Sequence, residues 1–436
     1  MTETPRSRVL LVGAEVDSFK SPWTAEDSLN ELALLADTAG LEVVGKIHQK
    51  LSHPFPQHFI GPGKVQEVAA LRESLKYNLI IFDDELSPAQ TRNLEKDLDC
   101  GVLDRTALIL DIFAQHARTH EGRLQVELAQ YNYLLPRLRR QWSHLERQAG
   151  TGGGTSAGGV VGLRGPGETQ LEIDRRLVDQ RISVLKEQLT DVHRHRELYR
   201  KRRRQNGMPV VALVGYTNAG KSTLLNALAG ADVYAADQLF ATLDPTTRQV
   251  DLPGGHQVLI TDTVGFIQKL PTQLVAAFRA TLEEITEADL LLHVLDITHS
   301  NAQEHAQTVE QTLKELKADG KPVLTVLNKI DRMDGVGEGD VAGMAETLGL
   351  PSDHIAVSAQ RGWGIEALRL RIEESLAQSM VALDAFIPYN RNDLVSLWHR
   401  RGVIEQEEYV NEGTHIQGRL PRTLVTAFAS FTNGRR

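Results

Sequence analysis

Sulfur and long apolar segments are both scarce in this 436-residue chain. Its single cysteine, Cys100, excludes an internal disulfide and a cysteine-rich zinc site, and such low usage is typical of a reducing compartment. No uninterrupted apolar run approaches the ~18 residues that a membrane-spanning helix needs. The first residues also lack the basic region and apolar core of a signal peptide. We therefore expect a cytoplasmic protein that does not span a membrane and is a monomer in solution.

Positive charge is outnumbered by negative charge over the whole chain but prevails in one segment. The net charge is −9, yet residues 116–204 contain 18 Lys and Arg against 10 Asp and Glu. This segment therefore carries +8, and the rest of the chain carries −17. A basic segment on an acidic body is typical of an arm that binds RNA or phosphate, although a solvated helix surface is the alternative.

A phosphate-binding loop is indicated by VALVGYTNAGKSTLLNAL at residues 211–228, which reads as a buried strand, a glycine-rich turn and a helix. The glycines let successive N–H groups face an anion, and the start of the helix adds its positive dipole end. We expect Lys221 to contact the β- and γ-phosphates and Ser222 to ligate Mg²⁺. The predicted loop comprises Gly215, Tyr216, Thr217, Asn218, Ala219, Gly220, Lys221, Ser222 and Thr223.

Guanine is the base that the downstream motifs favour. NKID follows an apolar run, and its carboxylate, Asp331, can accept both the N1–H and the N2 amino protons of guanine. Adenine offers no such pair of donors, and a site built on buried hydrogen bonds can reject the wrong base by ~10⁴ or more. SAQ follows a further strand-like run and is expected to close over the base. The candidate base contacts are Asn328, Lys329, Ile330, Asp331, Ser358, Ala359 and Gln360.

Two further segments are expected at the γ-phosphate and the metal. In DTVG, Asp262 can hold Mg²⁺ through water and the Gly265 N–H can meet the γ-phosphate, with Thr263 and Val264 beside them. The segment LFATLDPTTR at residues 239–248 contains three threonines, each able to complete the Mg²⁺ shell. These are Thr242, Thr246 and Thr247. The four motifs in this order predict a GTP-binding domain with GTP or GDP and Mg²⁺ as its ligands.

The fold class expected is multidomain α/β. Strand and helix signals alternate over residues 1–115 and predict a parallel α/β domain, in which the glycine turn before Lys64 fits no phosphate-loop spacing. Two heptad seams over residues 116–207 predict an antiparallel helical hairpin. The GTP-binding domain is assigned to residues 208–378 and a small α+β domain to residues 379–436. In the last domain, RTLVTAF at residues 422–428 is expected to be a strand.

The tip of the predicted hairpin, residues 150–168, is rich in glycine. Nine of the 18 residues from Gly150 to Gly167 are glycine. Two antiparallel helices need only a few connecting residues, so a plain linker is the weaker interpretation. We expect the loop to enter a narrow RNA cavity, where Arg164 and backbone N–H groups could meet phosphates and bases.

The chain resembles the HflX family of ribosome-associated GTPases, which are related to Obg, over essentially its full length. The resemblance rests on FIGPGKVQEV, on LRGPGETQLEIDRR, on GYTNAGKSTLLNAL with FATLDPTTR, and on the LVSLWHRRG tail. It implies binding to the large ribosomal subunit and its rRNA, with the hairpin reaching toward the peptidyl-transferase region. It also implies that the protein splits or rescues stalled or heat-damaged ribosomes.

The same resemblance narrows the metal ligands and the catalytic groups. By the Obg pattern, Thr242 joins Ser222 as a Mg²⁺ ligand, and the catalytic groups are Lys221, Thr242 and Gly265. The neighbouring residues expected to contact the nucleotide are Phe240, Ala241, Leu243 and Asp244.

One residue departs from the Ras pattern. Phe266 follows DTVG where Ras-like enzymes carry the glutamine that orients water, and a phenyl ring forms no such hydrogen bond. We therefore expect slow intrinsic hydrolysis, near the ~10⁻⁴ to 10⁻³ s⁻¹ of an unaided GTPase, and activation by the ribosome. The alternatives are an RNA-binding ribosome-assembly factor with a structural nucleotide, and a signalling GTPase whose hairpin recruits a protein.

Overall fold

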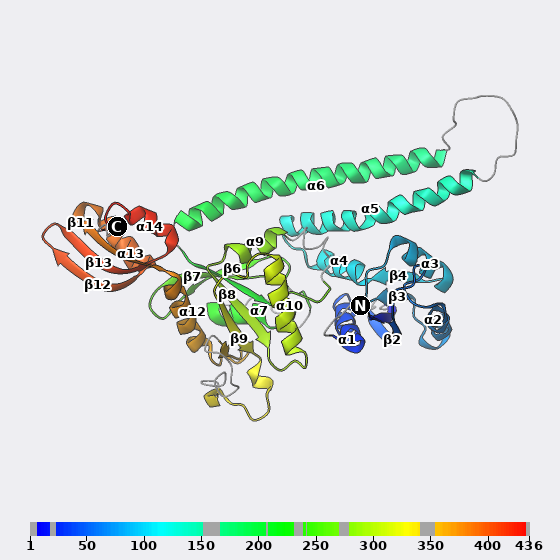
Figure 1. The fold of residues 1–436 in the computed structure, drawn as a ribbon, viewed down its shortest axis with the longest axis horizontal. Helices are drawn as coiled ribbons and strands as arrows, with labels where there is room; N and C mark the ends of the chain where they lie inside the picture. The colour runs from blue at the N-terminus through cyan, green and yellow to red at the C-terminus, as the bar shows by residue number, and fades with distance from the viewer. Residues whose placement is uncertain are drawn as a thin grey trace, which may run out of the picture. The chain divides into compact units, whose positions relative to one another are not determined.

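The computed structural model describes residues 7–17, 23–150, 166–205, 208–230, 239–240, 242–269, 279–340 and 354–432 (Figure 1). They belong to two units: Met1–Val192 with Lys269–Phe278, and His193–Gln268 with Arg279–Arg436. The expected multidomain α/β class is confirmed, while the four domain boundaries stay a prediction. None of the helices in the described ranges is long and apolar enough to cross a membrane.

Unit 1 contains a parallel sheet of four strands in the order β2-β1-β3-β4. Strands β1 and β3 are continuous apolar runs because helices cover the sheet. Leu10, Ile80 and Phe82 are at most 1% exposed and pack against helix residues such as Val68 and Leu94. The elements are β1 (Arg8–Val16), α1 (Ala25–Thr38), β2 (Glu42–Leu51), α2 (Pro62–Leu75), β3 (Leu79–Phe82), α3 (Pro88–Leu98), β4 (Gly101–Asp104) and α4 (Arg105–His116).

A buried charge network lies where β3 and β4 end. Arg105, only 1% exposed, donates to Asp83 Oδ1 at 2.8 Å and to Glu31. Asp83 also accepts from Ser28 Oγ at 2.6 Å and from Lys269 Nζ at 2.5 Å. Burial alone would raise the pKa of Asp83, but Arg105 and Lys269 outweigh it and hold that pKa below its usual value.

Asp104, at the end of β4, joins the sheet to the first helix of the hairpin. Its Oδ1 accepts from the Ala107 N–H at 2.9 Å, which caps α4, and from Tyr133 Oη at 2.8 Å. Its Oδ2 accepts from the Leu86 N–H at 3.1 Å and from Arg137 Nη2 at 2.8 Å. The base of the hairpin helix is therefore tied to the sheet by a buried carboxylate.

The hairpin consists of two long helices, α5 (His120–Gly150) and α6 (Pro166–Gln205), which lie side by side in Figure 1. The expected seam packs over its described part, where Arg181 on α6 also donates to both carboxylate oxygens of Glu127 on α5, at 2.7 and 2.8 Å. Residues 151–165, and with them Arg164, lie outside the described residues. The buried seam comprises Leu124, Leu128, Ile182, Leu185 and Leu189.

Unit 2 contains a six-stranded sheet in the order β10-β9-β8-β5-β7-β6, parallel except for β6. Its central strand β5, hydrogen-bonded to β8 and β7, is buried at every residue after Val210 because helices cover the faces of the sheet. The elements are β5 (Val210–Gly215), α7 (Lys221–Ala229), β6 (Thr246–Asp251), β7 (Gln257–Asp262), α9 (Arg279–Glu287), β8 (Leu290–Asp296), α10 (Ala302–Glu315), β9 (Val323–Asn328), 3₁₀ turns at Ile330–Arg332 and Glu338–Asp340, β10 (His354–Ala356) and α12 (Ile365–Ser379).

The C-terminal part of unit 2 is an antiparallel sheet of three strands in the order β11-β13-β12, packed on helices. The expected strand at residues 422–428 is wrong, because this segment is helix α14. Helical spacing brings Leu424 and Phe428 onto one face, where the Phe428 ring meets Trp398 edge-on at 5.1 Å. The elements are β11 (Val381–Pro388), a 3₁₀ turn (Tyr389–Arg391), α13 (Asn392–Arg401), β12 (Val403–Val410), β13 (Gly413–Leu420) and α14 (Arg422–Phe428).

Candidate nucleotide-binding site

The phosphate loop connects the end of β5 to the start of α7, where the sequence places it. Gly220 has φ of 94°, and a Cβ there would lie 2.3 Å from the Asn328 side-chain nitrogen. Gly215 approaches the neighbouring strand so closely that a Cβ would lie 2.3 Å from the Val294 carbonyl oxygen. Both positions therefore require glycine, and the loop curls at the N-terminal end of a helix, which favours an anion.

Lys221 lies inside this loop and is 7% exposed. Its Nζ donates to the carbonyl oxygens of Gly215 at 3.1 Å and Tyr216 at 2.8 Å. Burial lowers the pKa of Lys221 to about 8. A polyphosphate held by the loop would supply negative charge that stabilises the ammonium form further.

Three side-chain oxygens meet beside the loop and could hold a magnesium ion. Ser222 Oγ lies 2.8 Å from Thr242 Oγ1, and both donate to Asp262 Oδ2, at 2.6 and 2.9 Å. Asp262 Oδ1 is buried and has no hydrogen-bond partner within the described ranges. Burial raises the pKa of Asp262, and Lys221 opposes this only in part. A site of hard oxygens that includes a carboxylate whose charge is only partly compensated fits Mg²⁺ or its bound water.

The three candidate threonines separate in the structure. Thr242 reaches Ser222, whereas the Thr247 hydroxyl lies 2.9 Å from that of Thr261 within the sheet. Thr246 opens β6 and pairs with Asp262 through the backbone register. This geometry supports Thr242 as the ligand.

The base-recognition segments are held together by Asn328. Its side-chain nitrogen donates to the Ala219 carbonyl oxygen at 2.9 Å, and its oxygen accepts from the Ala359 N–H at 3.1 Å. Ser358 Oγ donates to Asp331 Oδ1 at 2.6 Å and so orients the carboxylate expected to bind guanine. Asn328 thus braces the phosphate loop against both base-recognition loops.

Gly265 lies against the phosphate loop and has room for no side chain. A Cβ there would lie 2.8 Å from Thr217 Cα and 3.0 Å from Lys221 Nζ. The next residue, Phe266, is 2% exposed, and its backbone pairs with the loop. The Phe266 ring is therefore part of the packed interior and is not directed into solvent.

Most of the predicted residues lie in these neighbouring loops. Ala241 is outside the described residues, and Gln360 is exposed. Asp296, at the end of β8, was not among the predicted residues, and its Oδ2 lies 2.8 Å from Lys329 Nζ in the predicted base-binding segment. Burial alone would raise the pKa of Asp296, but its bond to Lys329 helps to hold that pKa below its usual value. A carboxylate closing the apolar strand LLLHVLD was the signal available in the sequence.

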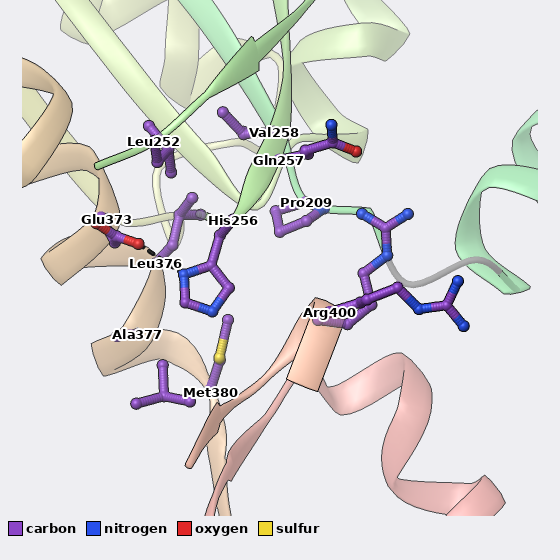
Figure 2. A pocket seen from close by; sticks show the side chains of 12 residues that line it. Pro209, Leu252, His256, Gln257, Val258, Glu373, Leu376, Ala377, Met380 and Arg400 are labelled. Carbon is purple, nitrogen blue, oxygen red and sulfur yellow. Dashed lines mark hydrogen bonds and ion pairs between the residues drawn. The ribbon is translucent and has the colours of Figure 1, made fainter. Parts of the chain in front are cut away.

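A separate pocket lies at the other end of β7 (Figure 2). There the His256 ring points toward Glu373, at 2.6 Å between Nδ1 and Oε1, and its Nε2 lies 3.0 Å from the Gly402 carbonyl oxygen. The pocket includes Gln257, whereas Asp262 ends the same strand five residues later, about 17 Å away at strand rise. This pocket is therefore not part of the nucleotide site.

A parallel sheet, a glycine-rich loop before a helix, a serine–threonine–aspartate oxygen cluster and an NKID segment define a P-loop GTPase. Comparisons with known proteins agree. Residues 26–114 match the family "GTP-binding GTPase N-terminal", residues 116–203 match "GTP-binding GTPase Middle Region", and residues 210–329 match "50S ribosome-binding GTPase".

Relatives match the chain over most of its length. GTPase HflX of Caldanaerobacter subterraneus is 45% identical over 93% of this chain and 90% of its own. GTPase HflX of Escherichia coli is 44% identical over 91% of this chain and 90% of its own. A GTP-binding protein of Sulfolobus solfataricus in complex with GDP shares 25% identity over 86% of this chain and 99% of its own, with a TM-score of 0.42. The chain belongs to the HflX family of GTPases, and it is a GTP hydrolase.

Proposed function

We propose that this GTPase binds the large ribosomal subunit, that the ribosome stimulates its GTP hydrolysis, and that it thereby splits or rescues stalled or heat-damaged ribosomes. The observation that carries the proposal is the position of Phe266, buried and paired with the phosphate loop through its backbone. A phenyl ring held there does not orient water, and a partner bound at the site would supply the group that does.

The basic hairpin is the part of the chain proposed to meet rRNA. Residues 116–204 carry a local charge of +8 on an acidic chain. Arg137 and Tyr133, both bonded to Asp104, would give the arm a firm base. Phosphate contacts from such an arm make affinity fall steeply with salt, whereas recruitment of a protein by apolar contacts would not.

For the nucleotide, we propose that Ser222 and Thr242 ligate Mg²⁺ and that Asp262 holds it through water. Mg²⁺ would offset charge on the β- and γ-phosphates, Lys221 would contact both, and the Gly265 N–H would face the γ-phosphate. Asp331, which Ser358 orients, would bind guanine.

We also propose that the chain divides into domains at residues 1–115, 116–207, 208–378 and 379–436. We propose further that the protein is a monomer and is located in the cytoplasm.

The test is single-turnover GTP hydrolysis by the full chain, alone and with purified large subunits, at low and high salt. We expect slow hydrolysis alone and stimulation by ~10³ or more at low salt, the range available from a supplied catalytic group. Deletion of residues 150–167 should reduce stimulation while leaving hydrolysis by the free protein unchanged. The Lys221→Ala variant, which lacks the predicted phosphate contact, gives the background rate of GTP hydrolysis.

An equal rate with and without subunits would contradict the proposal. If RNA binding and cell function then survived in Lys221→Ala, the chain would instead be an RNA-binding assembly factor with a structural nucleotide.

A further inference from the structure

Tyr216, the second residue of the phosphate loop, has a side chain that turns away from solvent. It is 3% exposed, and its ring stacks on the imidazole of His305 with centroids 3.8 Å apart and planes 8° apart. His305 belongs to α10 and lies in turn beside His299, at 4.4 Å between centroids. The side chain of Tyr216 is thus packed against helix α10, which lies outside the phosphate loop.

The Tyr216 hydroxyl bonds to the segment that follows Gly265. Its oxygen accepts the Gln268 N–H at 2.9 Å. Two backbone bonds run beside it, from the Thr217 N–H to the Phe266 carbonyl oxygen at 2.8 Å and from the Phe266 N–H to the Gly215 carbonyl oxygen at 3.1 Å. Three hydrogen bonds therefore fasten residues 266–268 to the phosphate loop, and one of them comes from a side chain.

The charge of the His305 ring decides what kind of contact this stack is. Burial lowers the pKa of His305 to about 4, with His299 adding to the effect, so the ring is neutral near pH 7. A neutral imidazole lying flat against a phenol supports the tyrosine without drawing it into a charge interaction. The ring stack and the phosphate-loop backbone together place the Tyr216 hydroxyl beside the Gln268 N–H.

We propose that Tyr216 is a positioning residue for hydrolysis. By fixing Gln268, it holds the short segment beginning at Gly265 against the loop, so that the Gly265 N–H stays beside Lys221, where a γ-phosphate would lie. GDP lacks that phosphate, so its binding does not depend on this bond. The inference rests on the proposed role of Gly265 and does not depend on ribosome activation.

The test is Tyr216→Phe in the full chain, which removes the hydroxyl and keeps the ring on His305. Loss of one hydrogen bond predicts a single-turnover rate of GTP hydrolysis without ribosomes that is about threefold to tenfold lower. We expect affinity for a non-hydrolysable GTP analogue to fall and affinity for GDP to stay within about twofold, since only the analogue has the γ-phosphate. Fluorescent nucleotides report both affinities.

The matched control is Tyr389→Phe, which removes a hydroxyl that bonds to the Val410 carbonyl oxygen in the C-terminal sheet. It should change neither rate nor affinity. An unchanged rate in Tyr216→Phe would overturn the proposal. An equal loss of GDP and GTP-analogue affinity would also overturn it, because the hydroxyl would then be only a structural support of the loop. If ribosomes failed to stimulate the wild type, the proposed function would fail while this result stood.

Discussion

The four-stranded sheet of unit 1 and the six-stranded sheet of unit 2 both have charged side chains where strands end, yet these charges are paired differently. In unit 1, Asp83 and Asp104 receive hydrogen bonds from Arg105, Tyr133 and Arg137, all supplied by the protein. In unit 2, the corresponding edge holds a buried lysine and a buried carboxylate whose pKa values are shifted toward neutrality. The difference is whether the counter-charge is already present in the fold.

The pKa values of the buried charged groups differ between the two edges in the same sense. Arg105 and Lys269 overcome the effect of burial and keep the pKa of Asp83 below its usual value. At the other edge, burial prevails: it raises the pKa of Asp262 and lowers that of Lys221 to about 8. Phosphates and Mg²⁺ would compensate Lys221 and Asp262, whereas at the unit 1 edge Asp83 and Asp104 already receive bonds from protein groups, although burial also raises the pKa of Asp84 there. A shared α/β fold therefore does not imply a shared function.

The glycine turn of unit 1 sharpens the contrast. Its Gly61 N–H, the kind of donor that would face an anion, is bonded to the Gln49 side chain at 2.9 Å. Lys64 forms an ion pair with Glu67 at 2.7 Å. Protein groups thus take the places that a phosphate would need.

The largest effect on nucleotide affinity is expected from Asp331→Asn at the unit 2 edge. An asparagine cannot accept both guanine donors, so affinity for GTP should fall on the order of 10³-fold or more. Xanthosine triphosphate, whose C2 carbonyl accepts a bond from an amide, should bind the variant better than GTP does. Competition binding measures both. The control is Asp334→Asn, on an exposed turn three residues later, which should leave the affinity for GTP unchanged. If Asp331→Asn lost GTP binding without binding the xanthine nucleotide better, Asp331 would not be the residue that recognises guanine.

Arg105→Met should have the next largest effect, which we expect on the stability of unit 1 and not on the affinity for nucleotide. It leaves Asp83 and Glu31 buried without their main partner, which costs about 3–5 kcal/mol of unfolding free energy. Hydrogen exchange of the β1 and β3 amides would report this for unit 1, with GDP affinity as the readout for unit 2. Arg391→Met removes an exposed pair and should change little. Unchanged protection in β1 would show that the network is not needed.

The pH dependence of that variant follows from the direction of the Asp83 shift. In the wild type the ionised form contributes stability above about pH 4, its unfolded pKa, and this is lost as pH falls through the lowered folded pKa. Without Arg105, Lys269 and Ser28 oppose burial with less effect, so the pKa of Asp83 would rise and protonation on acidification would relieve the cost. The stability gap between variant and wild type should therefore narrow from pH 7 to pH 5, by up to ~1.4 kcal/mol per pH unit for one proton. A gap that widened on acidification would oppose this account.

The smallest effect is expected from Lys64→Ala. If the glycine turn of unit 1 holds no phosphate, affinity for GTP and GDP should stay within about twofold. Fluorescent-nucleotide titration provides the measurement, with Lys221→Ala as the positive control. A loss comparable to that of Lys221→Ala would mean that the two edges are more alike than their hydrogen bonds indicate.

The sequence predicts the unit 2 edge better than the unit 1 edge for a physical reason. Phosphate loops depend on residues adjacent in the chain, so spacing alone marks Gly215, Gly220 and Lys221. The Arg105 network joins residues from four separate segments and leaves no local pattern. The same holds for the bond between Tyr216 and Gln268, which are 52 positions apart.

Short apolar segments mark the limit of periodicity. RTLVTAF is too short for its apolar pattern to separate strand from helix. A helix is favoured by the packing of Phe428 on Trp398, a contact between residues far apart in the sequence that local periodicity does not indicate. Likewise, spacing alone did not distinguish the three threonines of one segment; the resemblance to the Obg pattern favoured Thr242, and the fold brings Thr242 to Ser222.

Equilibrium dialysis with radiolabelled GDP would test the central contrast most directly, by counting guanine nucleotides bound per chain in the wild type and in Lys221→Ala. One nucleotide per wild-type chain and none in the variant is the result expected if only the unit 2 edge binds guanine nucleotide. A nucleotide that remains in Lys221→Ala, and is lost when Lys64 is also changed to alanine, would contradict that account.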